Sequence, residues 1–176
     1  AFEGMTLLDL VGVLDPVARI ASMGFDPTFR VEVVGLSEAV WCDHGMSVRV
    51  DKVRPALDAY DLVVIPGGPG ARRWQHDPET AAWLATRPAN RWTATVCTGS
   101  LVLGATGVLR GRRATTHHTA FDELAALGAE VVDDRVVESG AVTTAGGVTS
   151  GIDLGLRLVE RLTDRATRDA VARQMA

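Results

Sequence analysis

The sequence has few of the residues and patterns that identify disulfide-rich, metal-binding or membrane proteins. Two of its 176 residues are cysteines, Cys42 and Cys97, and no Cys-x-x-Cys pair occurs. This cysteine usage excludes a disulfide framework and predicts no metal or other cofactor. The chain also has no apolar run long enough to span a membrane and no charged-then-apolar leader. We therefore expect a cytoplasmic protein without a membrane partner.

The charge of the chain is small and evenly distributed. Acidic and basic residues mix along the sequence to a formal net charge of -4, so no broad basic field is available for a nucleic-acid backbone. The densest positive cluster, residues 110–113, is short and typical of a solvated turn. Hydrophobic residues make up 47% and charged residues 23% of the chain, as in an ordinary globular protein. We expect one domain over residues 1–176, with no nucleic acid among its partners.

Strand-like and helix-like segments alternate along the chain. The expected strands are short β-branched or apolar runs, at residues 29–35, 48–50, 62–65, a run ending at 97, 113–116, 130–132, 136–138 and 142–144. The expected helices are an early one around residue 9 and segments at 78–86, 99–109, 119–127, 151–162 and 165–175. This alternation predicts an α/β fold with a mainly parallel central sheet.

The most informative segment is ATVCTGSLVLGA, at residues 94–105. A β-prone run ends at Cys97 and small residues then begin a helix, which is the arrangement of a nucleophile elbow with sulfur in place of a serine hydroxyl. Such a turn exposes the side chain at its apex and points the first amides of the helix towards it. We therefore expect the thiolate to be favoured over the thiol. A plain buried cysteine is the alternative interpretation.

A glycine-rich turn follows the apolar run 62–65. Ligands of α/β sheets gather at the carboxyl ends of the strands, so this turn and the cysteine turn are expected to meet there. Backbone amides of Gly68 and Thr98 are candidates for stabilising a developing negative charge. The turn lacks the lysine of a P-loop and does not match G-x-G-x-x-G, so a nucleotide site is not favoured.

A thiol nucleophile also needs an acid or a base. Asp9 is one candidate because a carboxyl among apolar neighbours can hold a raised pKa and donate a proton, although a helix cap is the commoner role. His117 and His118 are the other candidates, since cysteine and histidine are paired in many thiol hydrolases. His44 and His76 lie in polar turns and have no stronger claim.

Five motifs, in this order along the chain, resemble the ThiJ/PfpI superfamily and, within it, the isonitrile hydratase branch. They are GMTLLDLVG at 4–12, IPGGPG at 65–70, VCTGS at 96–100, RATTH at 113–117 and TAGGVTSGID at 144–153. The resemblance implies a flavodoxin-like three-layer sandwich with a cysteine nucleophile elbow. Residues 1–176 would then form one ThiJ/PfpI-type (class I glutamine amidotransferase-like) domain. It also implies a homodimer that acts on a small-molecule substrate without a cofactor.

The resemblance assigns roles residue by residue. It implies that Cys97 is the nucleophile, that Asp9 is the carboxyl close to its sulfur, and that the Thr98 hydroxyl shapes the site. Amides of Gly67, Gly68 and Thr98 would bind the substrate. A histidine often stands at the position of His117, which we interpret as a wall of the site. The implied reaction adds water to an isonitrile and gives an N-substituted formamide through a thioimidate on the cysteine.

Other functions within the superfamily stay open. Similar domains form the ligand-sensing N-terminal half of AraC-type transcription regulators, in which the elbow is often degenerate. Glyoxalase-like and protein-repair members usually carry glutamate where this chain has Asp9. Protease-like members place histidine directly after the cysteine, where this chain has Thr98. The intact cysteine and Asp9 favour an enzyme of the lyase type.

Overall fold

The computed structural model describes all residues from 1 to 176 and is built around a four-stranded sheet. Its strands, in spatial order, are β5 (Leu62–Ile65), β6 (Trp92–Val96), β10 (Val142–Ala145) and β9 (Val136–Ser139). The first three are parallel and β9 is antiparallel to β10. In the register of the sheet, Thr95 lies opposite both Ile65 and Thr144. The carboxyl ends of the three parallel strands therefore meet at one edge of the sheet, as expected for an α/β fold.

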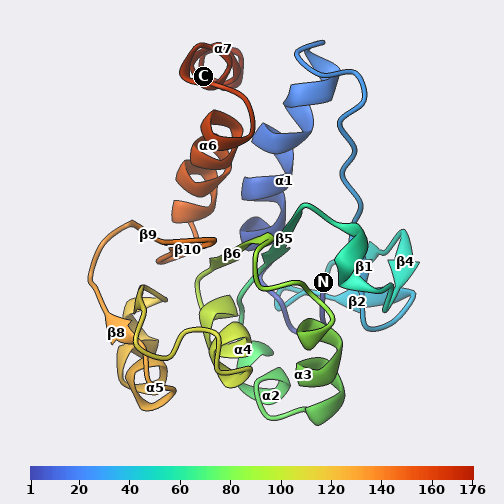
Figure 1. Ribbon diagram of the computed structural model, residues 1–176. Helices are drawn as coiled ribbons and strands as arrows, with labels where there is room; N and C mark the ends of the chain where they lie inside the picture. The colour runs from blue at the N-terminus through green and yellow to red at the C-terminus, as the bar shows by residue number, and fades with distance from the viewer.

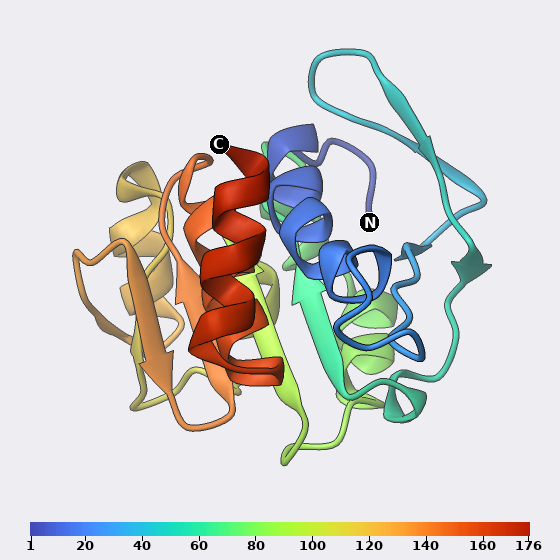
Figure 2. The ribbon, with the colours of Figure 1, turned by 90° about the horizontal axis from the view of Figure 1, so that it is seen from above.

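Helices cover both faces of the sheet and complete three layers (Figure 1). One face carries α1 (Leu7–Ser22), α6 (Ser150–Leu162) and α7 (Arg165–Met175). The other carries α2 (Ala71–Trp74), α3 (Pro78–Ala85), α4 (Gly99–Ala105) and α5 (Phe121–Ala126). Figure 2 shows α1 beside the C-terminal helices over the strands. The flavodoxin-like sandwich with a mainly parallel sheet is confirmed.

A separate apolar core fills the space on each side of the sheet. Between the sheet and α1 and α6, the buried side chains include Val17, Ile20, Leu154 and Leu158. On the α4 side, Leu101 and Leu103 are fully buried in the larger core. Cys97 belongs to the core on the α1 and α6 side, and Leu101 of the helix that follows it belongs to the core on the other side. The cysteine turn therefore joins the two cores. None of the helices combines the length and apolar character needed to cross a bilayer.

The remaining elements are short and lie outside the central sheet. They are two parallel pairs, one hairpin and two turns of 3-10 helix. Their bounds are β1 (Val34–Gly35) with β4 (Lys52–Val53), β7 (Arg113–Ala114) with β8 (Glu130–Val131), the antiparallel hairpin of β2 (Ala39–Trp41) and β3 (Ser47–Arg49), η1 (Leu57–Ala59) and η2 (His118–Ala120).

Three elements are shorter than the sequence predicts. The strand expected at 29–35 is regular only in β1, because residues 29–33 have no adjacent strand with which to form a ladder. The strand expected at 113–116 ends after β7 because the Thr115 amide donates to the side-chain hydroxyl of Thr144 and not to the backbone of a strand. The helix expected to reach residue 109 ends at Ala105, and Gly107 then has a φ of 82°. This left-handed conformation stops a helix and favours glycine.

Candidate active site

Cys97 lies at a strained turn between β6 and α4. Its φ is 54°, a conformation that costs a residue with a side chain about 1–2 kcal/mol. Neighbouring groups fix this backbone: the Cys97 amide lies 3.0 Å from the carbonyl of Ala145 and 2.8 Å from that of Gly146. The Thr116 hydroxyl donates to the Cys97 carbonyl at 2.8 Å. The elbow predicted from the sequence is therefore present, and its strain is stabilised by three contacts from neighbouring segments.

The turn after β5 presses against this elbow, and only glycine fits there. A Cβ atom added to Gly67 would lie 2.5 Å from the amide nitrogen of Thr98 and 2.9 Å from Oδ2 of Asp9. Gly68 has a φ of 126°, which side chains rarely adopt. The two glycines therefore let the β5–α2 turn, α1 and the elbow meet at the carboxyl edge of the sheet, as the sequence predicts.

Asp9 reaches the elbow from the first turn of α1. Its side chain is fully buried, and its Oδ2 accepts a hydrogen bond from the Gly67 amide at 2.9 Å. Oδ1 is also buried and has no hydrogen-bond partner in the protein. The N-cap of α1 is Thr6, so the helix-cap interpretation of Asp9 is wrong. A buried carboxyl with one free oxygen is instead available for proton transfer.

Burial sets the protonation of this pair of residues. Desolvation raises the pKa of Asp9 to about 6, although the Gly67 amide and the Cys97 side chain act in the opposite direction. Desolvation also raises the pKa of Cys97 to about 11, and the charge of Asp9 adds to this rise. The Thr98 amide and hydroxyl lower the pKa of Cys97 but do not outweigh burial.

The raised thiol pKa contradicts the expected preference for thiolate. The helix dipole at the start of α4 is outweighed by burial beside a carboxylate, both of which disfavour a charged sulfur. Between about pH 6 and pH 11 the two side chains of Cys97 and Asp9 therefore hold one proton between them. This shared proton can move from the sulfur to the carboxylate during a reaction.

Thr98 and Gly68 form a closed pair of hydrogen bonds. The Gly68 amide donates to the Thr98 hydroxyl at 2.9 Å, and that hydroxyl donates to the Gly68 carbonyl at 2.9 Å. The Gly67 amide is engaged by Asp9. Of the amides expected to bind substrate, the Thr98 amide faces the sulfur of Cys97. The two glycine amides instead position Asp9 and Thr98.

His117 is the N-cap residue of η2, and its ring contacts residues of that turn. Its ring is half-buried, its Nδ1 lies 2.8 Å from the Thr119 hydroxyl, and its centroid lies 4.3 Å from that of the His118 ring. Desolvation, followed by the charges of His118 and Arg72, lowers the pKa of His117. No hydrogen bond joins His117 to Cys97 or Asp9, so the structure does not bring it together with them.

Buried hydroxyl groups behind the elbow were missed from the sequence. Thr95 and Ser100 lie 2.7 Å apart through their hydroxyl oxygens, and Ser100 donates to the Thr115 carbonyl at 2.8 Å. The Thr115 amide donates to the Thr144 hydroxyl at 2.8 Å. Threonines at the carboxyl ends of several strands were the signal that could have revealed this network. It holds the elbow, β7 and β10 in fixed relative positions.

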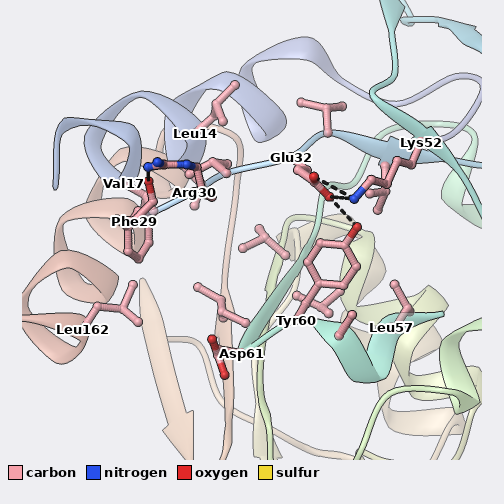
Figure 3. Close-up of a pocket in the computed structure, with 18 of the residues that line it drawn as sticks. Leu14, Val17, Phe29, Arg30, Glu32, Lys52, Leu57, Tyr60, Asp61 and Leu162 are labelled. Carbon is pink, nitrogen blue, oxygen red and sulfur yellow. Dashed lines mark hydrogen bonds and ion pairs between the residues drawn. The ribbon is translucent and has the colours of Figure 1, made fainter. Parts of the chain in front are cut away.

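A cavity of about 560 Å³ lies elsewhere, beside the free edge of β5 (Figure 3). Most of its lining is apolar and includes Val17, Phe29 and Leu62. Glu32 accepts hydrogen bonds from Tyr60 at 2.7 Å and from Lys52 at 2.9 Å at its margin. None of the site residues predicted from the sequence lines this cavity. No cluster of three or more His, Cys, Asp or Glu side chains with potential to hold a metal occurs anywhere in the structure.

Comparisons with known proteins identify the family of this chain. Residues 2–161 match the profile of the DJ-1/PfpI family. The chain is 36% identical over 176 residues to the isonitrile hydratase of Pseudomonas putida, an alignment that covers 99% of this chain and 75% of that protein. It is 33% identical over 129 residues to a glutathione-independent glyoxalase of Caenorhabditis elegans, covering 72% of this chain and 69% of the relative.

Solved structures share the same architecture. A ThiJ/PfpI family protein from Pseudomonas syringae superposes with a TM-score of 0.88 at 32% identity, covering 99% of this chain and 72% of that one. The DJ-1 protein of Schizosaccharomyces pombe superposes with a TM-score of 0.84 at 20% identity, covering 99% and 95% of the two chains. The second likeness concerns the fold alone.

Proposed function

The chain belongs to the DJ-1/PfpI family, and from this premise we propose that it adds water to isonitriles to give N-substituted formamides. The observation that carries the proposal is the Cys97–Asp9 pair, in which a fully buried carboxyl keeps one free oxygen beside a strained cysteine. The similarity to an isonitrile hydratase over 99% of the chain supports the choice of reaction.

In the first step the sulfur of Cys97 attacks the terminal carbon of R–N≡C. The thiol proton passes to Asp9, which delivers it to the same carbon, so that a thioimidate, R–N=CH–S–Cys97, forms without any change in oxidation state. The desolvation that raises the pKa of Asp9 to about 6 makes its carboxyl a suitable acid near neutral pH. The unpartnered Oδ1 is the oxygen available to carry this proton.

In the second step water attacks the thioimidate carbon. Asp9 takes one proton of the water and passes it to the imine nitrogen, which gives the tetrahedral adduct R–NH–CH(OH)–S–Cys97. Asp9 then takes the hydroxyl proton of this adduct as the carbon–sulfur bond breaks to release R–NH–CHO. It returns that proton to the sulfur of Cys97, so the pair returns to its starting state. The sum of the two steps is the addition of one water molecule to the isonitrile.

The other predicted site residues support this pair. Gly67 binds Oδ2 of Asp9 and Gly68 fixes the Thr98 hydroxyl. The Thr98 amide faces the sulfur and stabilises charge there, while His117 lines the approach to the site. We propose that residues 1–176 act as one catalytic domain. Exposed apolar side chains of Leu8, Val11 and Ile152 on α1 and α6 supply a contact surface for the homodimer implied by the resemblance.

The test is formamide production from a panel of aryl and alkyl isonitriles. We expect turnover by the wild-type protein, none by Cys97→Ala and a steep fall in Asp9→Asn. A folded wild-type protein that makes no formamide would sink the hydratase proposal. A glyoxalase is the second candidate, because the C. elegans relative is a glyoxalase, so methylglyoxal is included in the panel. Ligand binding without turnover of either substrate would favour the sensor-domain alternative.

A further inference from the structure

A second carboxylate, Asp43, acts on Asp9 through its charge and is bound to Thr6, the N-cap residue of α1. It occupies the turn of the β2–β3 hairpin, where its amide donates to the Met5 carbonyl at 2.9 Å. Its Oδ2 accepts a hydrogen bond from the Thr6 hydroxyl at 2.7 Å. Its side chain is 13% exposed, and its Oδ1 is buried without a hydrogen-bond partner.

Backbone contacts tie this second carboxylate to the first. The Thr6 amide donates to the Gly67 carbonyl at 2.8 Å, and the Gly67 amide donates to Oδ2 of Asp9 at 2.9 Å. The Asp9 amide donates in turn to the Thr6 carbonyl at 3.1 Å. Thr6 and Gly67 therefore hold Asp43 and Asp9 in fixed positions, so that their electrostatic interaction does not depend on a mobile side chain.

Few other charged groups face Asp9. The elbow presents Cys97 and the β5–α2 turn presents the backbone amide of Gly67, while Gly151 of α6 lies near the backbone carbonyl of Asp9. Burial is the main cause of the raised pKa of Asp9, and the negative charge of Asp43 raises it further. The one cation near Asp43 would be a protonated His44, whose Nε2 lies 3.9 Å from Oδ2 but whose side chain is 90% exposed.

We propose that Asp43 is a positioning residue that eases transfer of the shared proton of the Cys97–Asp9 pair from the sulfur to Asp9. The proton rests on the sulfur in the resting pair, and because the charge of Asp43 disfavours an ionised Asp9, moving the proton to the carboxylate and the negative charge to the sulfur costs less free energy. No other bond changes in this step. The inference rests on the proposed function, because it assigns Asp43 a role in preparing the nucleophile of that reaction. It also explains why a carboxylate is kept in a largely buried turn at a cost in desolvation.

The test is the Asp43→Asn variant, which removes the charge but keeps an oxygen to accept the Thr6 hydrogen bond. Alkylation of Cys97 by iodoacetamide is followed at pH 8 by mass spectrometry of the Cys97 peptide. We expect the rate to fall about threefold, the factor that corresponds to a change of about half a pKa unit. The carboxyl carbon of Asp9, titrated by NMR and assigned with Asp9→Asn, should show its midpoint lowered by the same half unit.

The matched control is Asp133→Asn, which makes the same charge change at an exposed residue of the β8–β9 loop. It should leave both readouts unchanged. If Asp43→Asn does not fold, Asp43→Ser removes the same charge and the measurements are repeated on it. An Asp9 midpoint and an alkylation rate equal to those of the wild type in a folded charge-free variant would overturn the proposal. A merely structural Asp43 would change the melting temperature and move neither readout.

Formamide production separates this inference from the proposed function. In Asp43→Asn, kcat should fall about threefold while KM stays constant, because Asp43 affects the proton of the pair and not substrate binding. A wild-type protein without turnover, combined with the expected NMR and alkylation shifts, would refute the hydratase and leave the role of Asp43 standing. Turnover in the wild type without those shifts would refute the role of Asp43 alone.

Discussion

The elbow site and the cavity beside β5 differ in almost every physical property. At the elbow, Asp9, Thr98 and Cys97 are at most 5% exposed, and the polar atoms around them are nearly all engaged in short hydrogen bonds. The cavity has a volume of about 560 Å³ and a mostly apolar lining. It lies along the edge of β5 that pairs with no other strand.

The difference shows which properties locate chemistry in this fold. The elbow combines a strained backbone at Cys97, a carboxyl whose pKa burial raises to about 6, and one buried oxygen without a partner. Each of these costs free energy, and together they indicate a functional site. The cavity does not combine these features. Burial raises the pKa of Tyr60 at its margin to about 12, but Tyr60 and Lys52 are both paired with Glu32. We therefore expect substitutions at the two regions to have very different effects.

The largest effect is expected for Gly67→Ala. The added methyl group would meet the Thr98 amide, the Val96 carbonyl and Oδ2 of Asp9 at 2.5 to 2.9 Å, and most of these atoms are backbone that cannot move away. We expect activity to fall about 100-fold or more, because small displacements of reacting groups cost that much. The measurement is kcat for formamide production.

A matched glycine controls for the extra methyl group. In Gly12→Ala the new Cβ lies 3.5 Å or more from its neighbours, an ordinary contact, and alanine favours the helix more than glycine does. This variant should retain activity and stability. Equal activity in Gly67→Ala and the wild type would show that the contact between the β5–α2 turn and the elbow does not matter for turnover.

The second effect concerns stability and pH at Asp9. The folded pKa of Asp9, about 6, lies above the ordinary value of 3.8 for an aspartate, so between these pH values the folded state binds more protons than the unfolded state. The wild type therefore loses stability from this group as pH rises from about 4 to 6. Asp9→Asn removes the buried charge and should stabilise the fold at pH 7 by about 2–3 kcal/mol.

The measurement for Asp9→Asn is the free energy of unfolding in urea at several pH values. The gain over the wild type should shrink below pH 4, where the carboxyl is protonated in both states. A gain that is independent of pH would show that the carboxyl is not destabilised by burial. A more stable but inactive variant would identify Asp9 as a residue retained for chemistry at the expense of stability.

A third, smaller effect is expected for Thr98→Val, which keeps the shape of the side chain and removes its hydroxyl. The amide and carbonyl of Gly68 would both lose their partner, and unpaired buried groups cost about 1–3 kcal/mol. We expect the unfolding free energy to fall by that amount and activity to fall with it. Thr98→Ser keeps the hydroxyl and should recover most of the loss. Equal losses in both variants would mean that the methyl group, not the hydrogen bonds, is important.

The sequence predicted the elbow better than its surroundings. A strand ending at Cys97 and the glycines after β5 follow from local patterns, because each turn needs particular backbone conformations. The place of Asp9 beside the sulfur came from the family resemblance, since its local pattern favoured a helix cap. The protonation of the Cys97–Asp9 pair could not be predicted from local patterns, because it is set by burial. That burial comes from helices that are distant in sequence. Asp43 was not found for the same reason: its hydrogen bond to Thr6 joins residues 37 positions apart. Residues 29–33 look like a strand in sequence, but no adjacent strand pairs with them.

The smallest effect is expected at the cavity, where Tyr60→Phe removes one hydrogen bond to Glu32. Glu32 keeps Lys52 as a partner, and because water reaches this margin, the loss in unfolding free energy should be about 1 kcal/mol or less. Formamide production should stay at the wild-type level, since no contact connects Tyr60 with Cys97 or Asp9. A large fall in kcat without a change in melting temperature would contradict the contrast between the two regions. It would mean that the cavity takes part in catalysis even though it holds none of the reacting groups.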